Sequence, residues 1–250
     1  MVLMDYYLFK IIVLFFTGIF MGLLNVMSGG ASLLTLPLLI FFGLDSSVAN
    51  ATNRVSIVVQ NLTGVISFTK EKITDFRSAW LLALLTVPGS VLGAALSLKV
   101  TNETFQKVLG VMNIIFVILL MIPVKRRERK DEKLSKWVYP AMTAIGFYGG
   151  FIQAGAGIFI MATLKLFSAW DLVKINAQKV VIATVFTIPA FTVFLLSGKI
   201  IWDLGISLAL GSIIGAWLAT QLSIKKGEKA VKVMLIITIL VITVWLFDII

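Results

Sequence analysis

Long runs of apolar residues, separated by short polar stretches, dominate the hydropathy pattern of the chain. Several of these runs are near the ~20 residues that an α-helix needs to cross a bilayer. They lie at about Leu8–Met27, Ala79–Leu98, Val108–Val124, Val180–Ser197, Ile206–Leu222 and Val231–Phe247. Two further runs, Ala31–Leu44 and Ile158–Phe167, are apolar but shorter than a full span. Because lipid leaves the backbone few ways to satisfy its polar groups, and the alternation of a β-barrel is not seen, the pattern predicts several membrane-spanning helices.

The sequence also repeats itself. The segment Gly18–Gly22 is echoed 128 positions later by Gly146–Gly150, and Gly29 is echoed by Gly157 at the same offset. Farther along, at offsets of 125 to 126, the matched residues are Asn50-Ala51 with Asn176-Ala177, Arg54 with Lys179, and Ser97 with Ser223. We therefore expect an all-α, polytopic transmembrane helical bundle of two homologous repeats.

The two repeats are predicted at residues 1–124 and 137–250, joined by a basic linker at 125–136. Each repeat begins with a glycine-rich interrupted helix and a short apolar segment. A helix that opens with the Asn-Ala motif and two more helices follow. This order gives about 8 full spans plus 2 short, interrupted or re-entrant segments for the whole chain.

The relative direction of the repeats depends on whether the short segments cross the membrane. If they turn back, each half has four crossings and the halves are parallel. If they cross, each half has five crossings, the halves are inverted, and more Lys and Arg residues share a side with the linker. Because cytoplasmic loops carry an excess of Lys and Arg, the second arrangement is mildly favoured. Both arrangements place the linker in the cytoplasm.

Each half has a glycine-rich break between its first helix and its short segment. Glycine permits a sharp turn, and the N–H groups that begin the next helix carry partial positive charge, which suits an anion. Matched breaks in inverted repeats mark transport sites, although packing is the alternative role for such glycines. The candidate substrate-binding residues here are Asn25, Ser28, Gly29, Gly30 and Ser32 in the first break, and Gln153, Gly155 and Gly157 in the second.

A second matched feature pairs Asn53-Arg54 with Gln178-Lys179. A charge within or beside a membrane span is costly unless it is used, so both cations could face one central cavity as counter-charges for an anion. The alternative is that both snorkel to the membrane interface as anchors. Asn61 lies seven residues beyond Arg54, on nearly the same helix face, and its counterparts in the second half are apolar. Any lining of the cavity by this position is therefore one-sided.

Acidic residues fall in loops or near helix ends, and none lies in the middle of an expected span. A proton-coupled pump usually needs a protonatable group in its pathway, so no proton carrier is evident. The same deficit argues against binding a bare divalent cation.

Composition narrows the function further. Of the 250 residues, 59% are hydrophobic and 14% charged, which is far more apolar than a soluble domain. Cysteine and histidine are absent, so disulfides, the usual metal sites and a Ser-His-Asp triad are excluded. No ATP-binding Gly-x-x-x-x-Gly-Lys-Ser/Thr motif is present. We expect no enzymatic activity, no cofactor and no metal. The net charge of +10 lies in short loops, where it indicates topology and lipid headgroup contacts rather than nucleic acid.

Several motifs carry a family resemblance that covers nearly the whole chain, duplication included. The Gly-x-x-x-Gly start, the Gly29-Gly30 break and the following Leu-Pro37 resemble the first signature of the sulfite exporter TauE/SafE family of membrane transporters. Ala51-Thr52-Asn53 and Pro88-Gly89-x-x-x-Gly93 are similar to its further marks. The chain departs from the pattern where Asn25, Met27 and Ser28 interrupt the glycine run, and where Gln178-Lys179 stands in place of Thr-Asn-Lys.

The resemblance implies a multi-pass secondary transporter in the inner membrane of a bacterium or archaeon, exporting or importing sulfite, sulfonates or other small organic anions. We expect alternating access about a site between the repeats, with the anion and membrane lipid as partners. The oligomeric state, including a homo-oligomer, stays open. Two alternatives are a passive anion channel that uses the same polar residues and a non-transporting membrane scaffold subunit.

Overall fold

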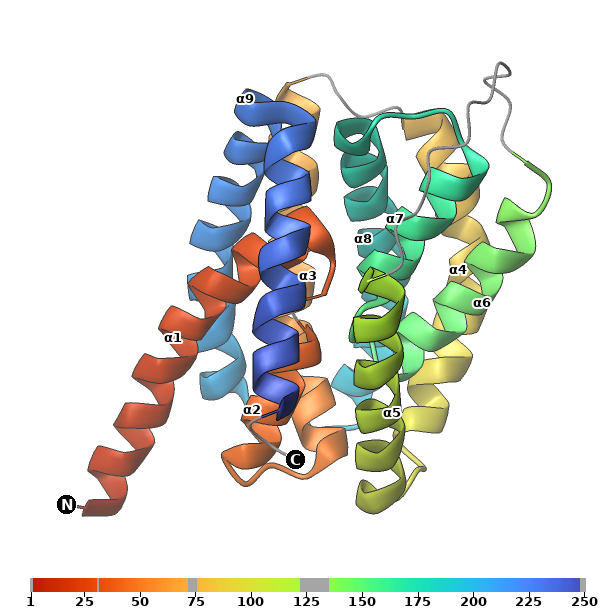
Figure 1. Cartoon of the computed structure of the whole chain (residues 1–250). Coiled ribbons are helices and arrows are strands. Elements are labelled where there is room, and N and C mark those ends of the chain that lie inside the picture. Colours follow the sequence, from red (N-terminus) through yellow and green to blue (C-terminus); the bar gives the residue numbers. More distant parts are fainter. Residues whose placement is uncertain (1, 31, 72–75, 122–134, 248–250) are drawn as a thin grey trace.

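The computed structural model describes residues 2–30, 32–71, 76–121 and 135–247, and every regular element in that part of the chain is an α-helix (Figure 1). This confirms the all-α prediction for the described residues. The helices are α1 (Val2–Ser28), α2 (Ser32–Phe41), α3 (Ser46–Lys70), α4 (Phe76–Ser97), α5 (Asn102–Met121), α6 (Val138–Phe151), α7 (Ala156–Phe167), α8 (Leu172–Leu196) and α9 (Trp202–Phe247). Most of the predicted linker at 125–136 lies outside the described residues.

Four helices in the described part are long and apolar enough to cross a membrane. They lie at Asp5–Ser28, Ala79–Ser97, Leu172–Leu196 and Trp202–Gly227. The two short apolar segments form the short helices α2 and α7, as expected from the sequence. The chain is therefore a multi-pass helical membrane protein, while the count of about eight full spans stays a prediction.

Helix α9 is broken inside its length. Gly227 has non-helical backbone angles (φ 62°, ψ −150°), and the helix bends back there (Figure 1). Helices α1 to α5 therefore precede the predicted linker, and α6, α7, α8 and the two segments of α9 follow it, while the repeat organisation stays a prediction. In Figure 1 the turns α2–α3, α4–α5 and α8–α9 lie at the lower end of the molecule, and the α7–α8 turn and the α9 bend lie at the upper end.

Glycines bring two pairs of helices into backbone contact. Helix α1 packs on α9, and α6 packs on α4. A Cβ atom on Gly215 would lie 1.9 Å from the carbonyl oxygen of Ile19, and one on Gly150 would lie 2.0 Å from that of Ser90. Small residues at helix interfaces permit this close approach in membranes, where packing replaces the hydrophobic effect.

Helices α3 and α8 pack on each other in the interior and bury polar residues along their length. The Asn-Ala motifs were expected to open these helices, but α3 starts at Ser46 and α8 at Leu172, so Asn50 and Asn176 lie one turn inside. The reason for α8 is that Asp171 caps it, accepting the N–H groups of Val173 and Lys174 at 2.8 Å. The asparagines bond across to other helices instead: Asn50 Nδ2 donates to Ser97 Oγ at 2.9 Å, and Asn176 Nδ2 to Ser223 Oγ at 3.4 Å.

Candidate functional site

The two glycine-rich breaks cross at one point in the interior. A Cβ atom on Gly29 would lie 2.5 Å from the Cα atom of Gly157, so the two backbones touch. Gly29 and Gly155 have positive φ angles of 83° and 74°, and Gln153, which is not a glycine, has a φ of 69°. These are left-handed conformations, which glycine adopts at little cost and other residues adopt rarely. The sharp turns expected from both breaks are therefore present.

A small polar pocket lies at this crossing. Its volume is about 10 Å³ for the centres of water-sized spheres, which is close to the space for one water molecule. Within the described part of the chain, its lining contains one cation and no acid. The lining residues are Asn25, Gly29, Asn61, Gln153, Gly157, Lys179, Ala183 and Phe186, six of which were expected from the sequence.

Lys179 reaches the pocket from α8 and is 2% exposed. Its Nζ atom donates to the carbonyl oxygens of Asn25 at 2.9 Å and Val26 at 2.5 Å. These carbonyls belong to the last turn of α1, where the helix dipole favours a positive charge. The side chain of one half therefore caps the first helix of the other half.

Arg54 makes the corresponding contact from the first half of the chain to the first helix of the second half. Its Nη2 atom donates to the carbonyl oxygens of Gly149, at 3.1 Å, and Gly150, in the last turn of α6. Its Nη1 atom donates to Gln153 Oε1 at 2.7 Å, and the guanidinium carbon lies 4.5 Å from the ring centroid of Phe194. Arg54 does not line the pocket. Of the two cations expected to face one cavity, Lys179 therefore lines this pocket and Arg54 does not, because the Nη atoms of Arg54 donate to Gln153 and the end of α6; anion binding by either residue stays a prediction.

Both cations are buried in the protein, with Arg54 at 0% exposure. The alternative that they snorkel to the membrane interface is therefore wrong. Burial of an ionised side chain is costly without hydrogen bonds, and here the helix-end carbonyls accept from the Lys179 ammonium and from Arg54 Nη2.

Asn61, on α3, lines the pocket with a side-chain amide whose N–H donors are available to a ligand. It is 3% exposed, and its Nδ2 atom has no hydrogen-bond partner among the residues that the structure describes. Gln153 approaches from the other side, where its Nε2 atom donates to Thr187 Oγ1 at 3.1 Å. A buried donor without a partner costs about 1–3 kcal/mol, so its placement beside a cavity indicates a site for an acceptor.

The remaining expected residues lie near the crossing without lining the pocket. Ser28 Oγ donates to Leu24 O at 2.7 Å within α1, and Asn53 Nδ2 donates to Ser32 Oγ at 3.4 Å, which joins α3 to α2. Outside the pocket lining are Ser28, Gly30, Ser32, Asn53, Arg54, Gly155 and Gln178. The structure thus separates residues that shape the breaks from residues that face the cavity.

Three residues of this region were missed from the sequence: Thr187, Ala183 and Phe186. Ala183 and Phe186 follow Lys179 at spacings of four and seven, so they share its helix face. That spacing was the available signal, although apolar residues gave no reason to select it. Thr187 is recognisable only through its contact with Gln153.

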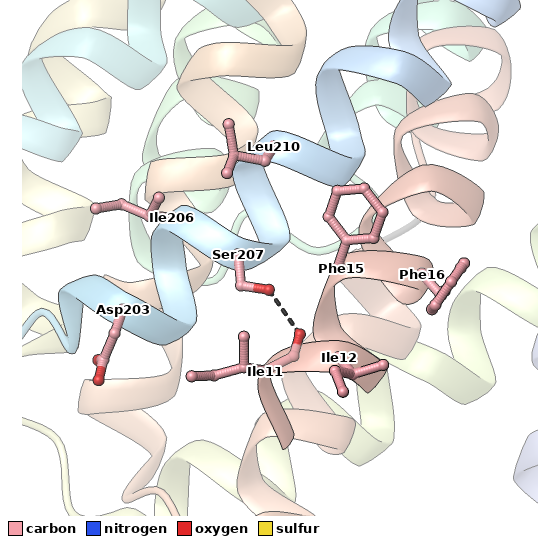
Figure 2. A pocket seen from close by; sticks show the side chains of 8 residues that line it. All are labelled: Ile11, Ile12, Phe15, Phe16, Asp203, Ile206, Ser207 and Leu210. Carbon is pink, nitrogen blue, oxygen red and sulfur yellow. Dashed lines mark hydrogen bonds between the residues drawn. The ribbon is translucent and has the colours of Figure 1, made fainter. Parts of the chain in front are cut away.

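A larger hollow lies elsewhere, between α1 and the first part of α9 (Figure 2). Its walls are mostly apolar and outward-facing, with Phe16 64% exposed, and Ser207 Oγ donates to the carbonyl of Ile11 at 2.6 Å across it. Its one charged lining residue is Asp203, which accepts a hydrogen bond from Tyr7. An apolar surface with an acid is unsuited to an anion, so the small interior pocket is the candidate site.

Comparisons with known proteins identify a family and several similar proteins. A model of the family described as "Sulfite exporter TauE/SafE" matches residues 14–246, which include both breaks, Arg54 and Lys179. The probable membrane transporter protein YfcA of Escherichia coli strain K12 is 27% identical over 228 residues, covering 90% of this chain and 85% of that protein. A probable membrane transporter protein of Haemophilus influenzae is 26% identical, covering 90% and 89%, and YjnA of Bacillus subtilis is 28% identical, covering 83% and 87%. No solved structure matches the chain.

Proposed function

Because the chain belongs to the sulfite exporter TauE/SafE family of membrane transporters, we propose that it is a secondary transporter of small anions, such as sulfite, sulfonates or related organic anions. The anion binds in the pocket between Gly29 and Gly157. Three similar proteins are named as probable membrane transporters, which supports transport rather than catalysis.

The pocket chemistry is the observation that carries this proposal. Its polar lining offers an ammonium from Lys179 and a free amide from Asn61, and no carboxylate of the described residues lines it. An ammonium has three donors, and the described residues accept from two of those of Lys179, so at least one is open to a ligand. Charge-assisted hydrogen bonds to an oxyanion are stronger than bonds to neutral acceptors, so the site favours an anion over a neutral solute.

The size of the pocket supports alternating access rather than an open pore. Its volume of about 10 Å³ for the centres of water-sized spheres is too small for an anion with several oxygen atoms. The breaks must therefore separate when an anion enters, and a carrier does this from one side of the membrane at a time. A permanently open anion channel would need a wider, continuous path.

Matched contacts support two inverted repeats that move about the crossing. Arg54 caps the end of α6, and Lys179 caps the end of α1, so each half holds the first helix of the other. Asn50 with Ser97 and Asn176 with Ser223 form a second equivalent pair. Two similar halves with mutual contacts of this kind provide two equivalent ways to pack, which is the basis of alternating access in transporters with inverted repeats.

We place the α7–α8 turn and the α9 bend on the cytoplasmic side of the inner membrane. The basic residues Lys165 and Lys174 flank the α7–α8 turn in the sequence, and Lys225, Lys226 and Lys229 flank the bend at Gly227. The turns α2–α3, α4–α5 and α8–α9 at the other end contribute fewer, including Lys99 and Lys199. The excess of positive charge in cytoplasmic loops gives this orientation.

Uptake of radiolabelled sulfite by proteoliposomes tests the proposal. Lys179→Met removes the pocket cation, whereas Lys174→Met, five residues earlier on α8, removes a cation that lies over the Trp170 ring at 5.0 Å. A charged hydrogen bond contributes about 1.5–3 kcal/mol, so Lys179→Met should lower the apparent affinity by about 10- to 150-fold, and Lys174→Met should leave it unchanged. Equal uptake by both variants would contradict the site. Single-channel currents would identify a pore, and absence of uptake of any tested anion would favour a scaffold.

A further inference from the structure

The two buried cations stand at equivalent positions of the repeats but have different surroundings. Lys179 lines the pocket, and its Nζ atom donates to two backbone carbonyls at the end of α1. Arg54 is not part of the pocket lining and contacts two carbonyls of α6, a side-chain amide and an aromatic ring. This difference separates a cation that a ligand can reach from one that it cannot.

An anion in the pocket competes with the end of α1 for Lys179. The ammonium would exchange a carbonyl dipole for a full negative charge, which is the stronger acceptor. The carbonyls that it leaves belong to Asn25 and Val26, three to four residues before the left-handed turn at Gly29. The amide of Gly29 also bonds to the Asn25 carbonyl, at 2.8 Å, so the turn and the ammonium share one acceptor. Loss of the ammonium therefore loosens the end of α1 at the point where the chain bends.

Arg54 instead fixes Gln153. The Gln153 backbone has a positive φ of 69°, which a non-glycine residue adopts only when its surroundings hold it. Its side chain is held at both atoms, with Oε1 accepting from Arg54 and Nε2 donating to Thr187. Because Gln153 lines the pocket and Arg54 does not, Arg54 acts on the site through Gln153.

We propose that Lys179 is a latch that moves from the end of α1 to the bound anion, and that Arg54 is a positioning residue that keeps Gln153 and the end of α6 fixed. The proposal rests on the anion transport proposed above for the same site. It assigns the mobile break to the first half and the static break to the second.

Hydrogen exchange without any anion tests the latch independently of transport. Lys179→Met should accelerate exchange of the Gly29 amide about tenfold and leave the amides of Ile152 and Gln153 unchanged. Arg54→Met should show the opposite pattern, since both of those amides bond to the Tyr148 carbonyl near the contacts of Arg54. If Arg54→Met does not fold, Arg54→Lys replaces it and should show a smaller change of the same kind. Equal acceleration at both breaks in either variant would overturn the division of roles.

Saturating sulfite then tests the exchange of partners. In the unmodified protein, sulfite should accelerate exchange at Gly29 and leave Gln153 unchanged, whereas Lys179→Met should show no response. Lys179→Arg keeps the charge and should recover part of the response. Sulfite uptake that occurs with equal protection of both breaks would overturn the latch and leave the transporter proposal intact. Absence of uptake would overturn the transporter proposal, and the anion-free exchange result would still stand for the contacts.

A double-mutant cycle separates positioning by Arg54 from a general structural role. Gln153→Ala alone should raise the KM for sulfite, and Arg54→Lys in that background should raise it no further, because residues that act through each other are not additive. Full additivity of the two changes in KM would overturn the assignment of Arg54 as a positioning residue.

Discussion

The backbone contact between Gly29 and Gly157 predicts that neither glycine tolerates even a single added methyl group. Each Cβ would meet backbone atoms of the other break at 2.5 Å, a distance that real Cβ atoms essentially never show. Backbone atoms cannot rotate out of the way as the end of a flexible side chain can, so the two breaks would have to move apart. Because the breaks cross at the pocket, this displacement would alter the site itself.

An added methyl group can destabilise the protein through backbone strain or through steric overlap, and two other glycines serve to tell these causes apart. Gly43 has a φ of 91° and nothing within 4 Å of its Cβ position, so Gly43→Ala adds only backbone strain, about 1–2 kcal/mol. Gly110 lies inside α5 with nothing within 4 Å, so Gly110→Ala should stabilise the protein by about 0.5–1 kcal/mol. Gly157→Ala adds only the overlap, about 1–3 kcal/mol, and Gly29→Ala adds overlap and strain, about 2–5 kcal/mol.

The assay is thermal unfolding of the four purified variants in one detergent, followed by sulfite uptake at a temperature where all are folded. Stability should fall in the order Gly110→Ala, unmodified protein, Gly43→Ala and then Gly29→Ala. Gly157→Ala should lose uptake more severely than Gly43→Ala even where their stabilities agree, because it displaces the pocket. The reasoning fails if Gly157→Ala is as stable as Gly110→Ala, since the crossing would then have room that the structure denies.

Three further substitutions probe the pocket and the helix contacts. Asn61→Leu should keep the free energy of unfolding within about 1 kcal/mol, because Nδ2 has no partner to lose, while raising the KM for sulfite; an unchanged KM would remove Asn61 from the site. Thr187→Val should cost about 0.5–1.5 kcal/mol and raise KM through Gln153, and an effect on stability alone would show that Thr187 does not orient that side chain. Gly215→Ala should lower the thermal midpoint by forcing α1 from α9, at a cost of about 1–3 kcal/mol, and a midpoint like that of Gly110→Ala would count against the close contact with Ile19.

Much of the fold follows from the sequence because apolar length and glycine position are local signals. The short helices α2 and α7, the breaks at Gly29 and Gly155, and the long helix before the first break all coincide with patterns read along the chain. The crossing of the breaks also agrees with their matched positions in the two halves. A bilayer imposes helix length and internal hydrogen bonding, so these signals are stronger here than in a soluble domain.

The roles of the two cations could not be predicted, since they depend on contacts between residues far apart in the chain. Arg54 bonds to Gly149 and Gly150, and Lys179 to Asn25 and Val26, across separations that local patterns do not specify. The helix-end carbonyls that satisfy them carry no sequence signature, because every residue has one. The sequence therefore identified the cations and left their partners open.

The most direct test of the anion site is a structure with bound selenite, in which selenium replaces sulfur and gives an anomalous signal. The absence of cysteine removes thiols that would react with selenite. We predict a single strong peak at the crossing of Gly29 and Gly157, about 3–4 Å from Lys179 Nζ and Asn61 Nδ2, with the Lys179 ammonium moved away from Asn25. An ordered peak in the outer hollow between α1 and α9, or at the basic helix ends with the pocket empty, would contradict the account.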